Sequence, residues 1–280
     1  MRWVICAGLL FAFAPNAFAG DFDVLRGTQP TYNWSGFYFG GQVGYSSADY
    51  NFGSAANSNV AFILRNTLIN QDEGISKWKV LQSTRSAGSD DIGGFVGYNS
   101  QWQDIVLGLE ANYNRVSIAA SSSGFEERTF FDSNSLPANH NYFYDVKVSA
   151  QAQLQMTDLA EFRARAGVAV SNYLPYAFVG FAVGRASYSN VATVEYTAVD
   201  YPAVTTPPTA PLADLSFGPV SQGQAQNNTY VYGLSTGGGV DIGLGPNLFL
   251  RGELEYIYFA PIDGIHVSVA SARVGAALKF

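Results

Sequence analysis

The stretch that decides the fold is Val267-Ser-Val-Ala-Ser-Ala-Arg-Val-Gly-Ala-Ala-Leu-Lys-Phe280. From Ala272 onward the even-numbered residues are apolar, and the odd-numbered residues are small or charged. A period of two is typical of a β-strand with one face against an apolar medium. We therefore predict a strand that directs Phe280 toward that medium and Arg273 and Lys279 to the opposite face.

The start of the chain predicts export. A basic residue at position 2 precedes an apolar run from Val4 to Ala14, and Ala17-Phe-Ala19 has the form of a cleavage site. These features indicate a signal peptide over residues 1–19, because the run is too short to span a membrane as a helix. The only cysteine, Cys6, lies within it, so the mature chain is expected to contain no disulfide.

Composition narrows the class of protein further. The 280 residues include 20 Phe, 17 Tyr and 29 Gly, and only 13% are charged. Removing the leader deletes one basic residue and leaves 14 basic against 22 acidic residues, a net charge of −8. This acidic balance argues against nucleic acid as a partner. After the leader no apolar run reaches the ~18 residues of a membrane helix, so the chain can cross a membrane only with strands.

Alternating segments recur along the chain and are joined in turn by tight turns and long polar stretches. The predicted strands are Gly36–Ser46, Asp91–Ser100, Asp104–Val116, Tyr176–Tyr188, Tyr230–Gly243, Leu248–Ala260 and the final strand. The predicted turns are Gln101–Gln103, Asn172–Pro175 and Leu244–Asn247. The predicted long loops are 47–89, with a short helix near Val60–Leu68, then 117–144 and 189–229, of which the last contains Pro202, Pro207, Pro208, Pro211 and Pro219.

Residues 145–171 allow two interpretations. Apolar residues occupy even positions from Val146 to Met156 and again from Phe162 to Val170. This shared parity favours one long strand that projects past the membrane. A hairpin that turns at Thr157–Ala160 is the alternative, and it would raise the number of strands.

Together these patterns predict an all-β protein. We expect a transmembrane antiparallel up-and-down β-barrel of about eight strands in the outer membrane, with short periplasmic turns and long extracellular loops. A short N-terminal lead over residues 20–35 would precede the barrel over residues 36–280.

Charged side chains on the strands must face the lumen, because ionised groups directed into lipid cost several kcal/mol each. An ion-pair network that fills the lumen is one interpretation, and a charged constriction that selects small ions is the other. A barrel of eight strands is only wide enough for its own side chains, which favours the network. The predicted set is Glu110, Glu161, Arg163, Arg165, Asp241, Arg251, Glu253, Glu255, Arg273 and Lys279.

Catalytic and metal sites receive little support. His266 and Ser268 share a strand face, but no carboxylate on that strand orients the histidine. Asp90 and Asp91 are adjacent and would face opposite sides of a strand. His140 lies in a predicted loop. We therefore expect no enzymatic activity, no cofactor and no metal.

The opening and closing segments, with two internal motifs, resemble the RopB-type major outer-membrane proteins of alpha-proteobacteria, also described as porin-family or outer-membrane immunogenic proteins with an OmpA-like eight-stranded barrel. The resemblance implies a structural and surface role, with weak porin-like passage in some members and haemin or host binding through loops in others. It also implies contact with outer-membrane lipid and lipopolysaccharide, and recognition of Phe280 by the barrel-assembly machinery. The motifs are Trp34-Ser-Gly-Phe-Tyr-Phe-Gly-Gly-Gln-Val-Gly-Tyr45, Phe162-Arg-Ala-Arg-Ala-Gly167, Glu253-Leu-Glu-Tyr256 and Arg273-Val-Gly-Ala-Ala-Leu-Lys-Phe280.

Overall fold

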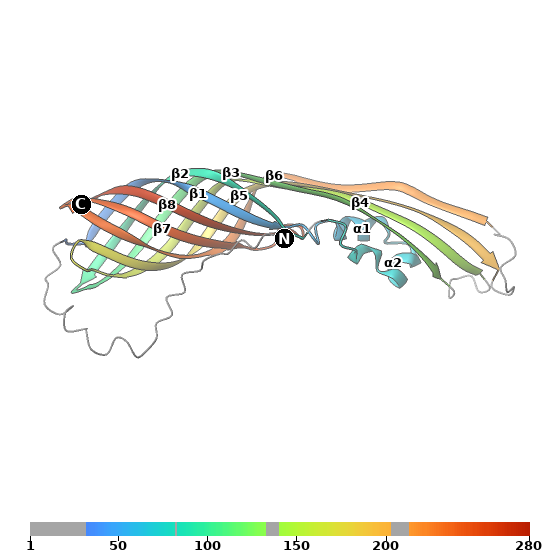
Figure 1. Cartoon of the computed structure of the whole chain (residues 1–280), viewed down its shortest axis with the longest axis horizontal. Coiled ribbons are helices and arrows are strands. Elements are labelled where there is room, and N and C mark those ends of the chain that lie inside the picture. The colour runs from blue at the N-terminus through green and yellow to red at the C-terminus, as the bar shows by residue number, and fades with distance from the viewer. Residues whose placement is uncertain (1–31, 82, 133–139, 203–212) are drawn as a thin grey trace, which may run out of the picture.

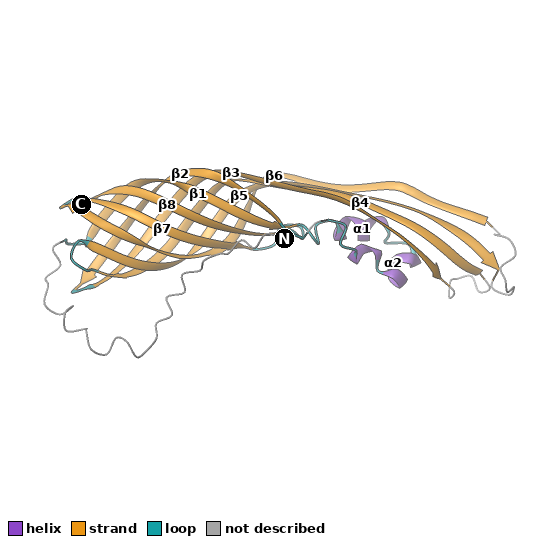
Figure 2. Ribbon diagram, viewed as in Figure 1, coloured by secondary structure: helices purple, strands orange, loops and turns teal. Residues whose placement is uncertain are grey.

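Eight antiparallel strands form a closed barrel in a computed structural model that describes residues 32–81, 83–132, 140–202 and 213–280 (Figures 1 and 2). Each strand pairs with its neighbours in the chain, and β1 pairs with β8 to close the ring. The predicted fold class is confirmed, whereas the predicted signal peptide lies outside the described residues. The strands are β1 Gly36–Asn51, β2 Arg85–Trp102, β3 Ile105–Asp132, β4 His140–Val168, β5 Tyr173–Pro202, β6 Ala213–Gly245, β7 Leu248–Phe259 and β8 His266–Lys279.

The outer surface of the barrel is apolar and aromatic. Large apolar side chains alternate outward on every strand, and Val179, Leu254 and Phe280 are 64 to 70% exposed. A surface of this kind is stable only against lipid, so the barrel spans a membrane, and a closed barrel of this architecture is an outer-membrane protein. The helices among the described residues are all too short or too polar to cross a membrane.

The connection between β1 and β2 contains three short helices rather than one. They are α1 Asn57–Ile63, α2 Leu68–Glu73 and the 3-10 helix η1 Ile75–Lys77. The loop predicted over 47–89 is therefore shorter than expected, because β1 continues to Asn51 and β2 begins at Arg85.

The largest departure from the sequence prediction is a sheet that leaves the barrel. The loops predicted over 117–144 and 189–229 are wrong, because β3 to β6 continue through most of these residues as paired strands. β2 pairs with β3 only as far as Arg115, and β7 pairs with β6 only as far as Gly233. Beyond these points four strands continue alone for roughly 50 Å, at 3.3 Å per residue (Figure 1). We call this part, residues 116–132, 140–157, 186–202 and 213–230, the extension.

Proline does not prevent strand pairing here, contrary to the prediction. Pro202 is the last residue of β5, and Pro219 lies where the register between β5 and β6 shifts, beside Gly218 with a φ of 87°. A missing N–H is tolerated at such an irregularity in an edge strand. Pro207, Pro208 and Pro211 lie outside the described residues.

The ambiguous segment forms one strand, β4, so the long-strand interpretation is confirmed and the hairpin is wrong. Its two halves nevertheless do not share a face. The register of β4 against β5 shifts between Met156 and Asp158, so Thr157 is an extra residue in a β-bulge. One extra residue exchanges the faces of a strand, so even-numbered residues face inward before Thr157 and lipid after it.

Candidate functional site

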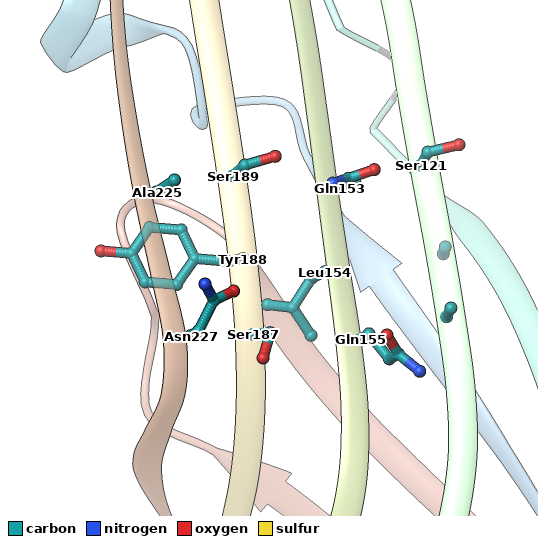
Figure 3. A pocket seen from close by; sticks show the side chains of 11 residues that line it. Ser121, Gln153, Leu154, Gln155, Ser187, Tyr188, Ser189, Ala225 and Asn227 are labelled. Atoms are coloured by element: carbon teal, nitrogen blue, oxygen red, sulfur yellow. The ribbon is translucent and has the colours of Figure 1, made fainter.

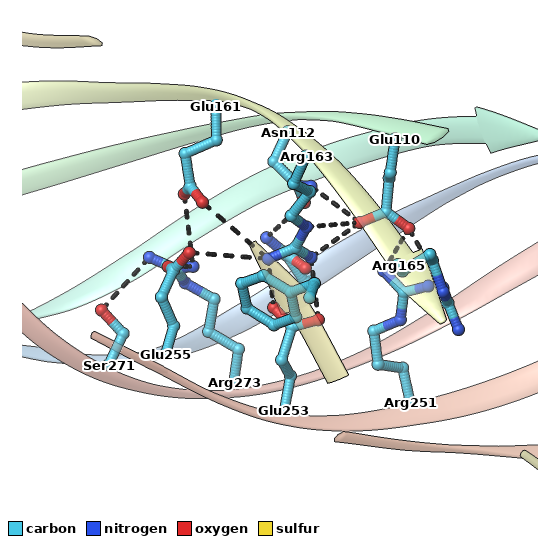
Figure 4. Close-up of polar contacts among 12 residues, drawn as sticks. Glu110, Asn112, Glu161, Arg163, Arg165, Arg251, Glu253, Glu255, Ser271 and Arg273 are labelled. Atoms are coloured by element: carbon cyan, nitrogen blue, oxygen red, sulfur yellow. Dashed lines mark hydrogen bonds and ion pairs between the residues drawn. The ribbon is translucent and has the colours of Figure 1, made fainter. Parts of the chain in front are cut away.

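The ten lumen residues predicted from the sequence all lie inside the barrel. These residues are 0 to 8% exposed, and nine of the ten form one network of ion pairs, of which Figure 4 labels all members except Asp241. Asp91 also joins the group, although the prediction omitted it. The outward direction of Ile92 on the same strand was the signal that could have identified it.

Glu110 is the centre of this network. Arg163 donates from Nε and Nη2 to Glu110 Oε1 at 2.9 and 2.6 Å. Nη1 of Arg251 lies 2.8 Å from Oε2, and Nη1 of Arg165 lies 3.3 Å from it. Tyr38 donates its hydroxyl to the same carboxylate at 2.6 Å. Three guanidinium groups therefore share one buried carboxylate. Several charge-assisted hydrogen bonds offset the desolvation of a buried charge better than one ion pair does.

Arg273 lies at the other end of the same network. Arg273 pairs with Glu255 and lies 3.2 Å from Asp91. Glu161 and Glu255 both lie beside Arg163, whose Nη1 is 3.9 Å from Glu161 Oε2 and 3.5 Å from Glu255 Oε1 (Figure 4). Six acidic residues, four arginines and Lys279 thus lie in the described part of the lumen.

Lys279 has a different role from the other nine. Its Nζ donates to the backbone oxygen of Ser35 at 3.1 Å and lies 5.5 Å from the ring of Tyr32. Tyr32 and Trp34 fold into the rim that carries the short turns, where Trp34 is fully buried against Phe249. The rings of Tyr32 and Trp34 therefore close the periplasmic end of the lumen.

The extracellular end is closed by an apolar core. Tyr50 and Phe52, whose rings stack at 6.0 Å, are fully buried together with Phe259. The core continues without a break beneath the helices, where Val60 of α1 belongs to the same cluster as Val148 of β4. Side chains thus fill the barrel from one rim to the other.

The extension has an apolar inner face, and buried hydrogen bonds hold the helices on it. Its inner face carries apolar residues from β3, β4 and β5, which the helices cover. Asn190 of β5 makes these hydrogen bonds. Its Oδ1 accepts from Asn59 Nδ2 at 2.9 Å, and its Nδ2 donates to Asp263 Oδ2 at 2.5 Å and to the Ala55 oxygen at 3.0 Å. One buried amide therefore joins α1, the β5 strand and the connection between β7 and β8.

The outer face of the extension is polar and uncharged over much of its length. Ser121, Gln153 and Ser189 lie side by side on β3, β4 and β5 (Figure 3). They line a shallow depression of about 550 Å³ together with Gln155, Ser187 and Asn227. Hydroxyl and amide groups of this kind can hydrogen-bond to uncharged polar ligands, but they provide no charge for an ionic one.

The catalytic candidates considered from the sequence lie on three strands, β2, β4 and β8. Asp91 faces the lumen and Asp90 is exposed outside, so the two carboxylates point away from each other. His266 is exposed at the first position of β8, opposite Asn51. His140 begins β4 and is not in a loop. No group of three or more His, Cys, Asp or Glu within the described ranges could hold a metal ion.

Comparison with known proteins adds similar barrels but no family. No protein-family model matches the chain, and no curated protein matches it in sequence. Among solved structures, the chain is similar to Neisserial surface protein A, with 14% identity, a TM-score of 0.35 and coverage of 88% of this chain and 98% of that one. It is also similar to Ail, the attachment invasion locus protein of Yersinia pestis, with 13% identity, a TM-score of 0.31 and coverage of 88% and 99%.

Proposed function

We propose that this chain is a surface-recognition protein in which the barrel is an anchor and the extension is the part that makes contact. The observation that carries the proposal is the continuation of β3 to β6 as a paired sheet with a helix-covered core, roughly 50 Å beyond the barrel. An ordered sheet presents its side chains at fixed spacing, so a partner binds without the entropy loss of ordering a loop.

The filled lumen supports this role over porin-like passage. Residues at the centre of the barrel, such as Glu110 and Arg163, are 1% exposed, and both rims are closed by apolar side chains. Ion passage would require the network to break, which costs several kcal/mol for each uncompensated charge. We therefore favour a receptor or adhesin role, with haemin or a host surface as the candidate partners, over weak passage of small solutes.

A tip-shortened variant tests the proposal. Glu127 pairs with Lys147 and Tyr196 pairs with Phe217, so a two-residue Asn-Gly turn can replace residues 128–146 and another can replace 197–216. Bacteria displaying the full chain are expected to bind haemin or animal-cell surfaces, and bacteria displaying equal amounts of the tip-shortened protein are expected to lose that binding. Equal binding by both would overturn the proposal.

Two further assignments rest on the sequence motifs and the closing strand. We propose kinship with RopB-type proteins through the motifs at both ends of the chain, and recognition of Phe280 by the barrel-assembly machinery. Phe280 is 70% exposed and stacks on Phe39 at 5.7 Å on the lipid side, where outer-membrane lipid and lipopolysaccharide would surround it. Deleting Phe280 is expected to reduce the amount of assembled protein in the outer membrane, and wild-type levels would contradict this role.

A further inference from the structure

The far end of the extension carries a row of aromatic rings on its inner face. Phe130 of β3, Tyr144 of β4, Tyr196 of β5 and Phe217 of β6 follow one another, with ring centroids 5.3, 6.0 and 4.9 Å apart. Tyr142 lies next to Tyr144 at 5.8 Å. These five residues come from all four strands, and we call them the tip platform.

The tip platform packs against the edge of the core beneath the helices, and its rings are not fully covered. Closer to the membrane, Val146 and Val148 are fully buried, whereas Tyr144 and Tyr196 remain partly exposed. Partly exposed rings on a rigid sheet provide flat apolar area at low entropic cost, because the strands already fix their positions.

The surroundings of the platform are acidic. Tyr142 lies directly between Asp132 of β3 and Asp200 of β5 in the strand register. The pKa of Tyr144 is raised to about 12, first by burial and then by the negative charge of groups that include Asp132 and Asp72. The electrostatic potential around these rings is therefore negative, because carboxylates lie beside them.

Acidic residues outnumber basic residues along the extension strands. They carry seven acidic and two basic residues, and both basic residues are already paired, Arg128 with Glu126 at 2.8 Å and Lys147 with Glu127 at 3.3 Å. The sequences of segments 133–139 and 203–212, which join these strands, contain no basic residue. The platform thus combines aromatic faces with the net negative charge of the extension strands.

We propose that the tip platform binds an extended, lysine- and arginine-rich peptide segment of a partner protein. Cations bind over aromatic faces, and flanking carboxylates add electrostatic attraction. In an extended peptide, side chains on one side repeat at about 6.6 Å, close to the spacing of the rings. The same geometry already occurs within the chain, where the Arg128 guanidinium lies 4.5 Å from the ring of Trp78. This inference rests on the proposed role of the extension in recognition and names the chemistry of its partner.

Binding of labelled hexa-arginine to the full-length protein in detergent micelles, measured by fluorescence anisotropy, tests the inference. We expect saturable binding that weakens with salt, and no binding of hexaglutamate. Tyr144→Leu and Tyr196→Leu should each weaken binding by about five- to thirtyfold, the loss of one partly desolvated cation–π contact. Phe143→Leu is the matched control, because Phe143 is 41% exposed on the opposite face of the same strand, and its binding should not change.

Charge is tested in the same way. Asp132→Asn should weaken hexa-arginine binding, whereas Asp145→Asn on the outer face of β4 should not. Heat-modifiable migration checks that each variant is folded. Absent binding, equal weakening by Tyr144→Leu and Phe143→Leu, or preference for a chitosan oligomer over hexa-arginine would overturn the inference. The proposed function would still stand after such results if the tip-shortened variant lost its binding to haemin or animal-cell surfaces. Failure of the peptide inference can therefore be told apart from failure of the proposed function.

Discussion

The extension consists of β3 to β6, four of the eight strands of the barrel, yet the two regions have opposite interiors. Inside the barrel, β4 contributes Glu161, Arg163 and Arg165, and lipid surrounds the apolar face. In the extension, the same strand turns Val148 and Leu154 inward, into the apolar core that also contains Val60 of α1. Thr157 is the residue at which β4 exchanges its faces. A strand can therefore keep one alternating pattern through two media if a bulge exchanges its faces at the membrane surface.

Deleting Thr157 should be the most damaging change, because it removes the exchange of faces between the barrel and the extension. Without the extra residue, either Lys147 and Gln153 enter the apolar core or the charges of the lumen face lipid. Each misplaced large apolar side chain costs about 1.5–3 kcal/mol and each charge in lipid about 2–4 kcal/mol. We expect no folded, heat-modifiable species on electrophoresis. Thr157→Ser keeps the chain length and should fold, and a folded deletion variant would contradict the role of the bulge.

Removing the central carboxylate should be the next largest change. Glu110→Ala leaves three buried guanidinium groups without their shared partner, and we expect the free energy of unfolding to fall by about 3–5 kcal/mol. Urea titration in lipid vesicles measures this change. Glu127→Ala is the matched control in the extension, because its pair with Lys147 is nearly half exposed, and it should cost no more than about 1 kcal/mol. Equal losses in the two variants would remove the distinction between a buried network and a surface pair.

Asn190→Ala should separate the helix layer from the barrel. The change leaves the amide of Asn59 and the carboxylate of Asp263 without their partner, a cost of about 1–3 kcal/mol. Hydrogen exchange should accelerate in α1 and in the neighbouring part of β5, while the amides of β7 and β8 within the membrane remain protected. Faster exchange throughout the barrel would show that the two regions unfold as one unit.

Alkaline pH should produce the smallest and most local change. The pKa of Tyr144 is raised in the folded protein to about 12, above the ~10 of an unfolded tyrosine, so its contribution to stability is complete below about pH 10. That contribution is lost as the pH rises toward 12, and it concerns only the extension. Tyrosinate absorbance should show a late step that Tyr144→Phe removes. An unchanged titration in that variant would contradict the assignment.

Local alternation predicted the barrel well, since lipid-facing and lumen-facing residues on β1, β2, β7 and β8 follow from parity alone. The extension could not be predicted in the same way. Its outer face is rich in serine and glutamine, which resembles loop composition, and Pro219 argued against a strand although a register shift accommodates it. Thr157 was hidden because the parity of apolar residues continues across the bulge. The partners within the lumen network depend on the pairing of distant strands, which a pattern along one strand does not specify.

Planar-bilayer recording of the refolded protein most directly tests the division between a filled barrel and a contact-making extension. We predict no conductance steps across a range of salts and voltages, because the network around Glu110 and the closed rims leave no continuous path for ions. Reproducible ohmic steps from the full-length protein would contradict this division and would assign the barrel a role in transport.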